Sequence, residues 1–351
     1  MHTFRTHRRL AQISGLFTLG LVAAGCGLVG SDGGSAAASG EEGQGIVRFT
    51  FAPDPVWDWL SDEGIIAEME EESGMRIVAS STWDEFGLFA GGHADIVSAA
   101  SYEVPVIEEE TGQETVTIGR YNRDRSVIIT RADNPAETIA DLQGETISSF
   151  TSVSATLVWG AYIKDLYDLD FRTGGGDYEI IVADPQNQAA LVENGETAAC
   201  VCLPEFAAPG LRSGELKILH DGRSSADMFA ENYAEGHDGP MINVFLANAE
   251  WYESHPEEAA FFLEVWERGL QEWDQNQAEI IAAYPQHFSV EDEEDIDFVQ
   301  QFLADNDWFV DTVYLDQEWI DQEMELFDLM KSTGFMPEDQ ENPNFVVAET
   351  S

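Results

Sequence analysis

The sequence predicts an α/β fold in which two doubly wound sheets enclose a cleft. Segments with the patterns of strands and helices alternate between residues 46 and 98, and the same order returns between residues 146 and 202. The chain then comes back to a strand at residues 241–247. Alternating strands and helices are typical of parallel sheets with crossover helices. One such unit inserted into another, with two crossings, produces the bilobal arrangement that a cleft requires.

The first unit begins at residues 46–51, where apolar and polar side chains alternate as in a strand. Prolines end this strand, and we expect one helix from there to Ser73-Gly74, with Trp57 and Met69 on its apolar face. Further strands are predicted at residues 75–80 and 96–98, separated by a short helix at residues 84–89. Residues 116–118 and 126–130 add extended segments.

The second unit repeats this order. Strands are predicted at residues 146–149, 178–182 and 197–202, with helices at residues 154–166 and 187–193 between them. After the strand at residues 241–247 the chain reads as helices to Lys331, the longest at residues 256–276. We therefore expect a first lobe from residues 45–130 and 236–345 and a second lobe from residues 131–235. No repeat with a period of about 20–50 residues is present, which argues against a solenoid.

The first 25 residues have the pattern of a secretory signal. Arg8-Arg9 precede an apolar run that ends at Ala23-Ala24-Gly25-Cys26, and this run is shorter than the roughly 20 residues that span a bilayer. Small residues before Cys26 fit cleavage by a lipoprotein signal peptidase. We therefore predict a signal peptide at residues 1–25, lipidation of Cys26, and attachment of the protein to the membrane at the cell surface or in the periplasm.

A flexible tether is predicted at residues 26–44, because Gly, Ser, Ala and acidic residues dominate this stretch. A transmembrane anchor, or a disordered tail with an accidental cysteine, is the alternative interpretation of the N-terminus. Arg8-Arg9 also leaves the choice between twin-arginine and general export open.

The charge of the chain is extreme. It contains 67 acidic and 16 basic residues, for a net charge of −51, and removal of Arg5, Arg8 and Arg9 with the signal peptide changes this to −54. Because 44% of the residues are hydrophobic, disorder is not expected. The acids are spread along the chain, which favours a salt-adapted protein whose surface repulsion is screened in concentrated salt. A nucleic-acid partner is incompatible with such a field.

Only two cysteines follow Cys26, and both lie in the predicted strand Ala199-Cys200-Val201-Cys202. We interpret their side chains as pointing to opposite faces of that strand and expect two buried thiols rather than a disulfide. No nearby histidine completes a metal site, so we expect no bound metal.

Several segments resemble a known family when taken in their order along the chain. They are the lipobox at Cys26, the segment Phe86-Gly87-Leu88-Phe89-Ala90-Gly91-Gly92-His93-Ala94-Asp95-Ile96, the segment Asp141-Leu142-Gln143-Gly144-Glu145-Thr146-Ile147, the segment Val192-Glu193-Asn194-Gly195-Glu196-Thr197-Ala198-Ala199, Gly239-Pro240, and Pro256-Glu257-Glu258-Ala259. Together they resemble the substrate-binding proteins of ABC importers for nitrate, sulfonate and taurine, a family that includes binders of thiamine-pyrimidine precursors. Gln143 and Glu145 stand where that family usually has lysine, and Thr197 stands where it has aspartate.

The resemblance implies a two-lobed periplasmic-binding-protein fold of type II. It also implies a monomer that captures a small molecule such as a sulfonate, taurine, nitrate, a small carboxylate or a pyrimidine-like compound. The partners would be an ABC transporter permease with its cytoplasmic ATPase and, through lipidated Cys26, the membrane. No cofactor and no catalytic activity are expected.

The candidate ligand-binding residues follow from a rule of open parallel sheets, whose ligands bind beyond the carboxyl ends of the strands. These positions are Asp54, Trp57, Thr82, Trp83, Ser101, Tyr102 and Glu103 in the first lobe, and Thr151, Ser152, Ser154, Glu205 and His237 in or near the second. Ordinary N-capping is the alternative role of the Ser and Thr residues. By contrast, Trp251, Trp266, Trp273, Trp308 and Trp319 have helical spacings and are predicted to lie in the core.

Basic residues are scarce, so the cluster Arg120, Arg123 and Arg125 before the first crossing is notable. A guanidinium group suits a carboxylate or sulfonate, and we include Arg123 among the candidate ligand residues. Pairing with surface acids is the alternative role. Glu103 and Glu205 would instead favour a cationic or hydrogen-donating ligand, which leaves the charge of the ligand open.

Two other functions compete with the transport hypothesis. Enzymes that resemble these binding proteins, the thiamine-pyrimidine synthases, act inside cells and carry a dense cysteine motif, which this chain lacks. Hydrolase and nucleotide-binding motifs (Gly-x-Ser-x-Gly, a Walker loop or His-Glu-x-x-His) are absent as well. A receptor that reports its ligand to a sensor kinase has the same sequence features as a transport receptor.

Overall fold

The computed structural model describes residues 45–151, 153–290, 292–306 and 308–347. All of them belong to one unit of the chain, Gly43–Ser351. The predicted signal peptide, Cys26, the tether and Ser152 lie outside the described residues.

The first five-stranded sheet has the order β2-β1-β3-β12-β4. Its strands are β1 (Ile46–Phe51), β2 (Arg76–Ser81), β3 (Ile96–Ala99), β4 (Thr115–Arg123) and β12 (Met241–Asn248). β1 pairs in parallel with β2 and β3, and β12 is antiparallel to both β3 and β4. The strand that returns late in the chain is therefore inserted between two early strands.

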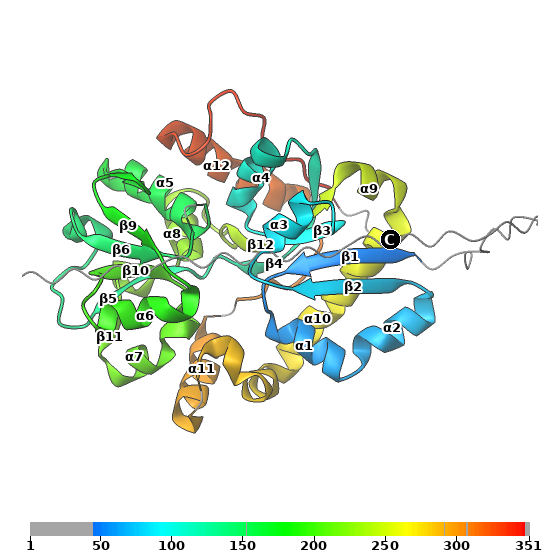
Figure 1. The fold of residues 1–351 in the computed structure, drawn as a ribbon, viewed down its shortest axis with the longest axis horizontal. Coiled ribbons are helices and arrows are strands. Elements are labelled where there is room, and N and C mark those ends of the chain that lie inside the picture. Colours follow the sequence, from blue (N-terminus) through cyan, green and yellow to red (C-terminus); the bar gives the residue numbers. More distant parts are fainter. Residues whose placement is uncertain (1–44, 152, 291, 307, 348–351) are drawn as a thin grey trace, which may run out of the picture. The chain divides into compact units, whose positions relative to one another are not determined.

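The second five-stranded sheet has the order β11-β5-β10-β6-β9. Its strands are β5 (Val127–Arg131), β6 (Thr146–Ser149), β9 (Glu179–Val182), β10 (Ala199–Cys202) and β11 (Leu216–Ile218). β6 is parallel to β9 and β10, whereas β5 is antiparallel to β10 and β11. β7 (Phe171–Arg172) and β8 (Gly175–Gly176) form a separate small hairpin. Figure 1 shows the two large sheets as separate groups of arrows, each with its own helices.

Helices connect and cover the strands of both sheets. They are α1 (Pro55–Asp62), α2 (Ile65–Ser73), α3 (Glu85–Ala90), α4 (Val104–Thr111), α5 (Ala155–Tyr167), α6 (Pro185–Glu193), α7 (Ala208–Ser213), α8 (Ser225–Asn232), α9 (Ala249–Ser254), α10 (Pro256–Ala283), α11 (Glu293–Asp305) and α12 (Gln317–Thr333). Short 3₁₀ turns are η1 (Ser101–Glu103), η2 (Ile139–Leu142), η3 (Pro204–Ala207), η4 (His220–Gly222) and η5 (Pro285–Phe288).

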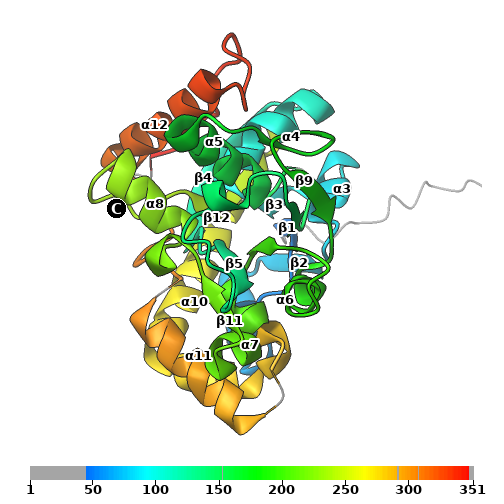
Figure 2. The same cartoon turned by 90° about the vertical axis from the view of Figure 1, so that its left-hand side faces the viewer.

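Each large sheet has its own hydrophobic core. The first core packs α1 and α10 against the first sheet, with Phe49, Phe245 and Trp266 in mutual ring contact. The second core packs α5 and α12 beside the second sheet and contains Trp159 and Phe327. Figure 2 shows α12 next to α5, so the last helix of the chain covers elements of the middle of the sequence.

Two crossings join the sheets, as the sequence predicts. The chain leaves the first sheet after β4 and enters the second at β5, and it returns between α8 and β12. The mixed α/β architecture with two sheets is confirmed. The exact residues at which one lobe ends and the other begins stay a prediction, although β5 pairs within the second sheet.

Two predicted helices differ in detail from the observed ones. The single helix expected before Ser73-Gly74 is divided into α1 and α2 at Gly64, whose φ of 74° is left-handed. A left-handed residue interrupts the helical hydrogen-bond ladder, and glycine adopts it without steric cost. The long helix expected at residues 256–276 continues to Ala283, with non-helical backbone at Asn276.

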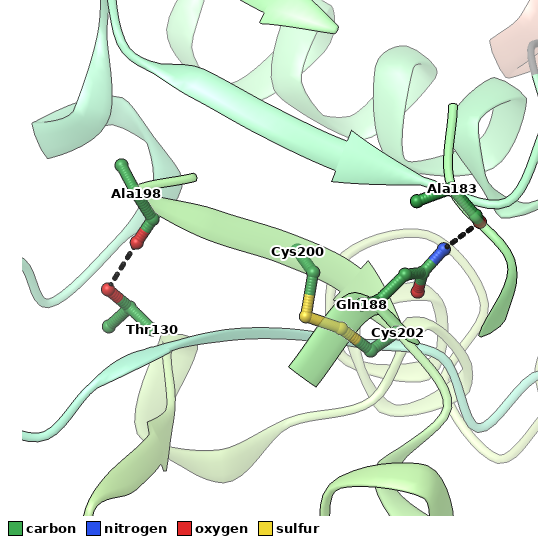
Figure 3. Close-up of a disulfide and its surroundings, with 6 residues drawn as sticks. All are labelled: Thr130, Ala183, Gln188, Ala198, Cys200 and Cys202. Atoms are coloured by element: carbon green, nitrogen blue, oxygen red, sulfur yellow. Dashed lines mark hydrogen bonds between the residues drawn. A yellow bond between two sulfur atoms is a disulfide. The ribbon is translucent and has the colours of Figure 1, made fainter. Parts of the chain in front are cut away.

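The prediction of two free thiols was wrong, because the structure contains a disulfide between Cys200 and Cys202. Figure 3 shows the two sulfur atoms joined along one side of β10. Successive side chains alternate between the faces of a strand, so residues two apart lie on the same face. With Cα atoms 5.4 Å apart, the two cysteines lie at a separation usual for disulfides.

Candidate functional site

A cavity of about 120 Å³ lies at the carboxyl ends of the parallel strands of both sheets. In the first sheet it is lined by the ends or following loops of β1, β2 and β3, and in the second by those of β6, β9 and β10. Residues of β4, β12 and the segment around Trp308 complete the wall. This is the position at which open α/β sheets bind ligands, since loops and helix N-termini meet there.

Carboxyl groups line the side of the cavity formed by the first sheet. Oδ1 of Asp54 caps α1 by accepting the N–H groups of Val56 at 2.9 Å and Trp57 at 3.2 Å. Oε2 of Glu103 accepts the N–H of Ala100 at 2.9 Å. Burial raises the pKa of Asp54 to about 6 and that of Glu103 to about 8, because a carboxylate loses hydration there. Glu85 lies close by, and burial raises its pKa to about 7.

An arginine–glutamate pair lies between the two sheets. Arg125, in the first crossing, donates from Nε and Nη2 to Oε1 of Glu205 in η3, at 3.1 and 2.7 Å. Its guanidinium carbon lies 3.8 Å from the ring centroid of Trp308. The Glu205 side chain is 2% exposed. Among the described residues, neither Nη1 of Arg125 nor Oε2 of Glu205 has a hydrogen-bond partner.

A chain of hydrogen bonds crosses the wall formed by β3, β4 and β12. Nδ2 of Asn122 donates to Oδ1 of Asn243 at 3.0 Å, and Nδ2 of Asn243 donates to the Ser98 hydroxyl at 2.8 Å. Ser98 and the Tyr121 hydroxyl share a further bond of 2.8 Å. This arrangement leaves Oδ1 of Asn122, a buried residue, without a partner in the described part of the chain.

Aromatic side chains close one end of the cavity. Trp83 follows β2 and Phe150 follows β6, and their rings meet edge to face with centroids 5.7 Å apart. Trp83 is 42% exposed, an unusual fraction for so large an apolar side chain. Because the two rings come from different sheets, their contact bridges the opening between them.

Sequence and fold comparisons agree with this geometry. Residues 63–230 match the family described as periplasmic substrate-binding proteins of phosphonate ABC transporters. No curated protein matches the chain in sequence. Residues 63–230 are therefore similar to the substrate-binding proteins of ABC importers. The resemblance found in the sequence is therefore confirmed at this level.

Solved structures place the fold of this chain among the periplasmic binding proteins. The alkanesulfonate-binding protein from Xanthomonas axonopodis pv. citri bound to MOPS is similar with a TM-score of 0.67 at 14% identity, covering 86% of this chain and 98% of that one. The aliphatic sulphonate-binding protein from Escherichia coli has a TM-score of 0.63 at 15% identity, covering 88% and 96%. A Candida albicans gene product with the generic periplasmic binding protein fold has a TM-score of 0.62 at 11% identity, covering 87% and 98%.

Five of the candidate residues line the cavity: Asp54, Trp83, Glu103, Ser154 and Glu205. Ser152 lies outside the described residues. The other candidates do not line the cavity, and they are Trp57, Thr82, Ser101, Tyr102, Arg123, Thr151 and His237.

Most of those other side chains have structural partners. Trp57 packs in the first core and Tyr102 is buried in the second. The Ser101 hydroxyl accepts the Met241 N–H at 3.3 Å, and Nε of Arg123 donates to the Asp238 carbonyl at 2.6 Å. His237 lies 3.5 Å from Glu323, where both side chains are fully buried.

Further hydroxyl groups stabilise turns beside the cavity. The hydroxyl of Thr82 accepts the Asp84 N–H at 3.1 Å, and that of Thr151 accepts the Ser154 N–H at 2.9 Å. Both contacts are turns that precede α3 and α5, whose N-cap residues Asp84 and Ser154 have no side-chain capping bond.

Several lining residues are not among the predicted ligand residues: Glu85, Asn122, Asn243, Trp308 and Arg125, the last of which belongs to the arginine cluster from which Arg123 was chosen. Asn243 carries a usable signal, since it is a polar residue flanked by apolar residues within β12. Trp308 is 3% exposed, as a core residue would be, and also lines the cavity.

The described ranges contain neither a membrane-spanning helix nor a cluster of metal-ligating side chains. No helix there is both long and apolar enough to span a bilayer. Nor do three His, Cys, Asp or Glu side chains in those ranges gather so that they could hold a metal ion.

Proposed function

We propose that this protein is a lipid-anchored receptor that captures a small organic molecule and delivers it to the permease of an ABC importer. The observation that carries the proposal is the cavity, because parallel strands of both sheets contribute to its wall. A molecule bound there contacts both sides at once. It therefore stabilises the closed arrangement relative to any arrangement in which the sheets move apart.

Contacts away from the cavity support such a closed arrangement. Arg212 of α7, beside the second sheet, pairs with Glu294 of α11 at 2.8 Å and also with Asp295. α11 follows α10, which packs on the first sheet. These pairs and the contact between Trp83 and Phe150 connect the two sides of the cavity at separate places.

The receptor is further proposed to be attached to the membrane through Cys26 and to work in concentrated salt. The tether at residues 26–44 would let the binding unit reach the permease, and the net charge of −51 is the basis for salt adaptation. Sulfonates, taurine, nitrate, small carboxylates and pyrimidine-like compounds remain the ligand classes to be compared.

The first experiment tests ligand capture. Protein isolated from its own cells in molar salt is denatured, and the released small molecules are identified by mass spectrometry. Trp83→Ala should weaken binding of the identified molecule at least about tenfold, because it removes an exposed ring from the cavity wall. Trp251→Ala is the matched control, since Trp251 lies on α9 and stacks on His255 outside the cavity. Release of no small molecule, together with no ligand-dependent rise in melting temperature, would contradict the proposal.

The second experiment tests delivery. Cells lacking the protein should lose uptake of the identified molecule, and cells with Cys26→Ala should release the protein or keep its uncleaved precursor. Labelling with a radioactive fatty acid should mark the wild type only. Unchanged uptake with a lost transcriptional response would instead show a receptor for a sensor kinase.

A further inference from the structure

The cavity wall carries a strong excess of acidic side chains. Its carboxyl groups belong to Asp54, Glu85, Glu103 and Glu205, whereas Arg125 supplies the one guanidinium group in the lining. Glu205 already pairs with that guanidinium. The remaining three carboxyl groups form no ion pair with any described residue. His287 also lines the cavity, and its Nε2 lies 2.7 Å from the Asp58 carboxylate.

Among the side chains that line the cavity, hydrogen-bonding atoms without a partner are more often acceptors than donors. Oε2 of Glu205, Oδ1 of Asn122 and Oε2 of Glu85 are acceptors without partners within the described chain. Two donors of the lining also lack partners in the described chain, Nη1 of Arg125 and Nε1 of Trp308. Glu205 is 2% exposed and Asn122 is 3% exposed, so water cannot freely replace the missing partners. A buried polar atom without a partner is unfavourable, and a bound molecule that supplies the partner is favoured.

An oxyanion complements the unpartnered atoms and carboxyl groups of the cavity wall poorly. Sulfonate and phosphonate oxygens are acceptors, so they would find the two free donors of Arg125 and Trp308 but would also approach three unpartnered acceptors and the carboxyl groups of the wall. An ammonium, amidinium or guanidinium group supplies only donors and a positive charge, and therefore complements both features of the wall.

The apolar part of the cavity wall further restricts the chemical class of the ligand. Trp83, Phe150 and Phe206 line the cavity beside the polar groups. The ring of Trp83 is 42% exposed, and aromatic faces attract cations as well as apolar groups. A ligand with a charged nitrogen group and an apolar or aromatic body would satisfy both parts.

We propose that the cavity selects a small organic cation that donates N–H hydrogen bonds to Glu205 and Asn122 and places its apolar part against Trp83, in preference to a sulfonate or phosphonate. This assignment rests on the proposed function as a solute receptor and specifies the substrate class of the same site. It differs from the ligands named for the proteins of similar sequence or fold, which are phosphonates and sulfonates.

Matched probes of opposite charge test the assignment. Benzamidine is compared with benzenesulfonate, and methylguanidine with methanesulfonate, by calorimetry on the full chain in molar salt. Within each pair the cation should bind at least about tenfold more tightly. Equal or tighter binding of the sulfonate would overturn the assignment, and so would binding of neither member of either pair.

Substitutions connect the preference to named residues. Glu205→Gln should lower the affinity for benzamidine about tenfold and raise that for benzenesulfonate, because it removes a carboxylate and leaves Arg125 without its counter-charge. Glu323→Gln is the matched control. Glu323 is also a fully buried carboxyl group, but it does not line the cavity. Equal effects of the two substitutions would overturn the role of Glu205.

The pH dependence of binding supplies a second readout. Glu85 on α3 and Glu103 in η1 have pKa values raised to about 7 and about 8 by burial; the charge of Asp84 adds to the shift of Glu85, and the charges of Glu85 and Asp124 add to that of Glu103. As pH rises from 6 to 8.5 the two cavity groups ionise, so affinity for benzamidine should rise. Protonated carboxyl groups could instead donate to an oxyanion, and affinity for benzenesulfonate would then fall over the same range. An increase confined to benzenesulfonate would contradict the assignment.

The experiments separate failure of this assignment from failure of the proposed function. If the molecule released from the native protein is an oxyanion whose binding requires Trp83, the receptor function stands and the cationic class is wrong. If no molecule is released and none raises the melting temperature, the receptor function itself is contradicted.

Discussion

The backbone N–H of Asp124 donates to the carbonyl oxygen of Pro240 across 2.7 Å, and this bond joins the two segments through which the chain crosses between its sheets. Asp124 lies between β4 and β5, and Pro240 directly precedes β12. Nε of Arg123 adds a bond of 2.6 Å to the Asp238 carbonyl in the same region. Any movement of one sheet relative to the other must therefore deform both segments together.

Gly239 lies inside this junction, and we predict that Gly239→Ala destabilises the protein by about 2–4 kcal/mol. Its φ is 90°, and an added Cβ would lie 2.3 Å from Cβ of Ala226. Both backbone strain and steric conflict therefore oppose the substitution. Gly64→Ala is the control, since Gly64 has a φ of 74° but no atom within 4 Å of the added carbon. Urea unfolding should show a clearly smaller loss for Gly64→Ala, and equal losses would contradict the steric part of the argument.

Arg212 connects α7 to α11, and we predict that Arg212→Ala weakens ligand binding two- to fivefold with little change in melting temperature. The Arg212 side chain is 33% exposed, so solvent and salt screen its pairs with Glu294 and Asp295. What the substitution removes is a contact of the closed arrangement. Small-angle scattering without ligand should show a larger radius of gyration for the variant. Arg131→Ala, which breaks an exposed pair with Asp133, is the control and should leave affinity unchanged.

The stability of the protein should decrease as pH rises from about 6.5 to 8. Burial raises the pKa of Glu103 and Glu323 from 4.5 to about 8. The folded protein then keeps protons that the unfolded chain has lost, so the free energy of unfolding falls as pH rises through this window. Burial lowers the pKa of His220 and His237 from 6.5 to about 4, which has the opposite effect, but only below about pH 6.5. Above that pH, of these groups only the carboxyl groups change the free energy of unfolding as pH rises.

The variant Glu323→Gln tests whether the free energy of unfolding falls with pH for the reason given. Each such group contributes up to about 1.4 kcal/mol per pH unit, so the variant should show a shallower slope by up to that amount. Glu318→Gln, at an exposed position of the same helix, should leave the slope unchanged. Unfolding in urea at several pH values and constant salt measures both. A wild-type stability that rises over this window would show that Glu323 is ionised in the folded protein.

Arg123 and Arg125 illustrate what the sequence can and cannot predict here. The alternation of apolar and polar residues predicts β1 with its observed bounds. The rule that ligands bind beyond the carboxyl ends of parallel strands predicts where the cavity lies. β4, however, ends at Arg123, and only Arg125 lines the cavity, while Arg123 bonds to the other crossing segment. The directions of the two side chains depend on contacts with Asp238 and Glu205, which are 115 and 80 positions away in the sequence. Such contacts leave no local pattern in the sequence.

The disulfide should contribute little to stability, because it closes a very short loop. For so few residues the loss of chain entropy in the unfolded state corresponds to about 1.5 kcal/mol. In the Cys26→Ala variant, thiol titration of the denatured protein should detect no thiol before reduction and two afterwards. Unfolding of the oxidised and reduced forms should then differ by less than about 2 kcal/mol. Two free thiols before reduction would contradict the observed bond.

Salt concentration should change the melting temperature of the protein more than any other solution condition. Even if each of the 16 basic residues paired with one acid, most of the 67 acidic residues would lack a cationic partner. Their repulsion acts over about 10 Å at 0.1 M ionic strength and over about 3 Å at 1 M. We therefore predict that the melting temperature falls by more than about 10 °C when salt is lowered from molar to tens of millimolar, which corresponds to a few kcal/mol.

Sucrose, which is uncharged, should not restore the melting temperature at low salt. In α2 the exposed Glu71 and Glu72 follow other acids, so replacing both by lysine should reduce the dependence measurably. A melting temperature independent of salt would show that the acids are compensated within the fold, and the salt-adapted interpretation would then be wrong.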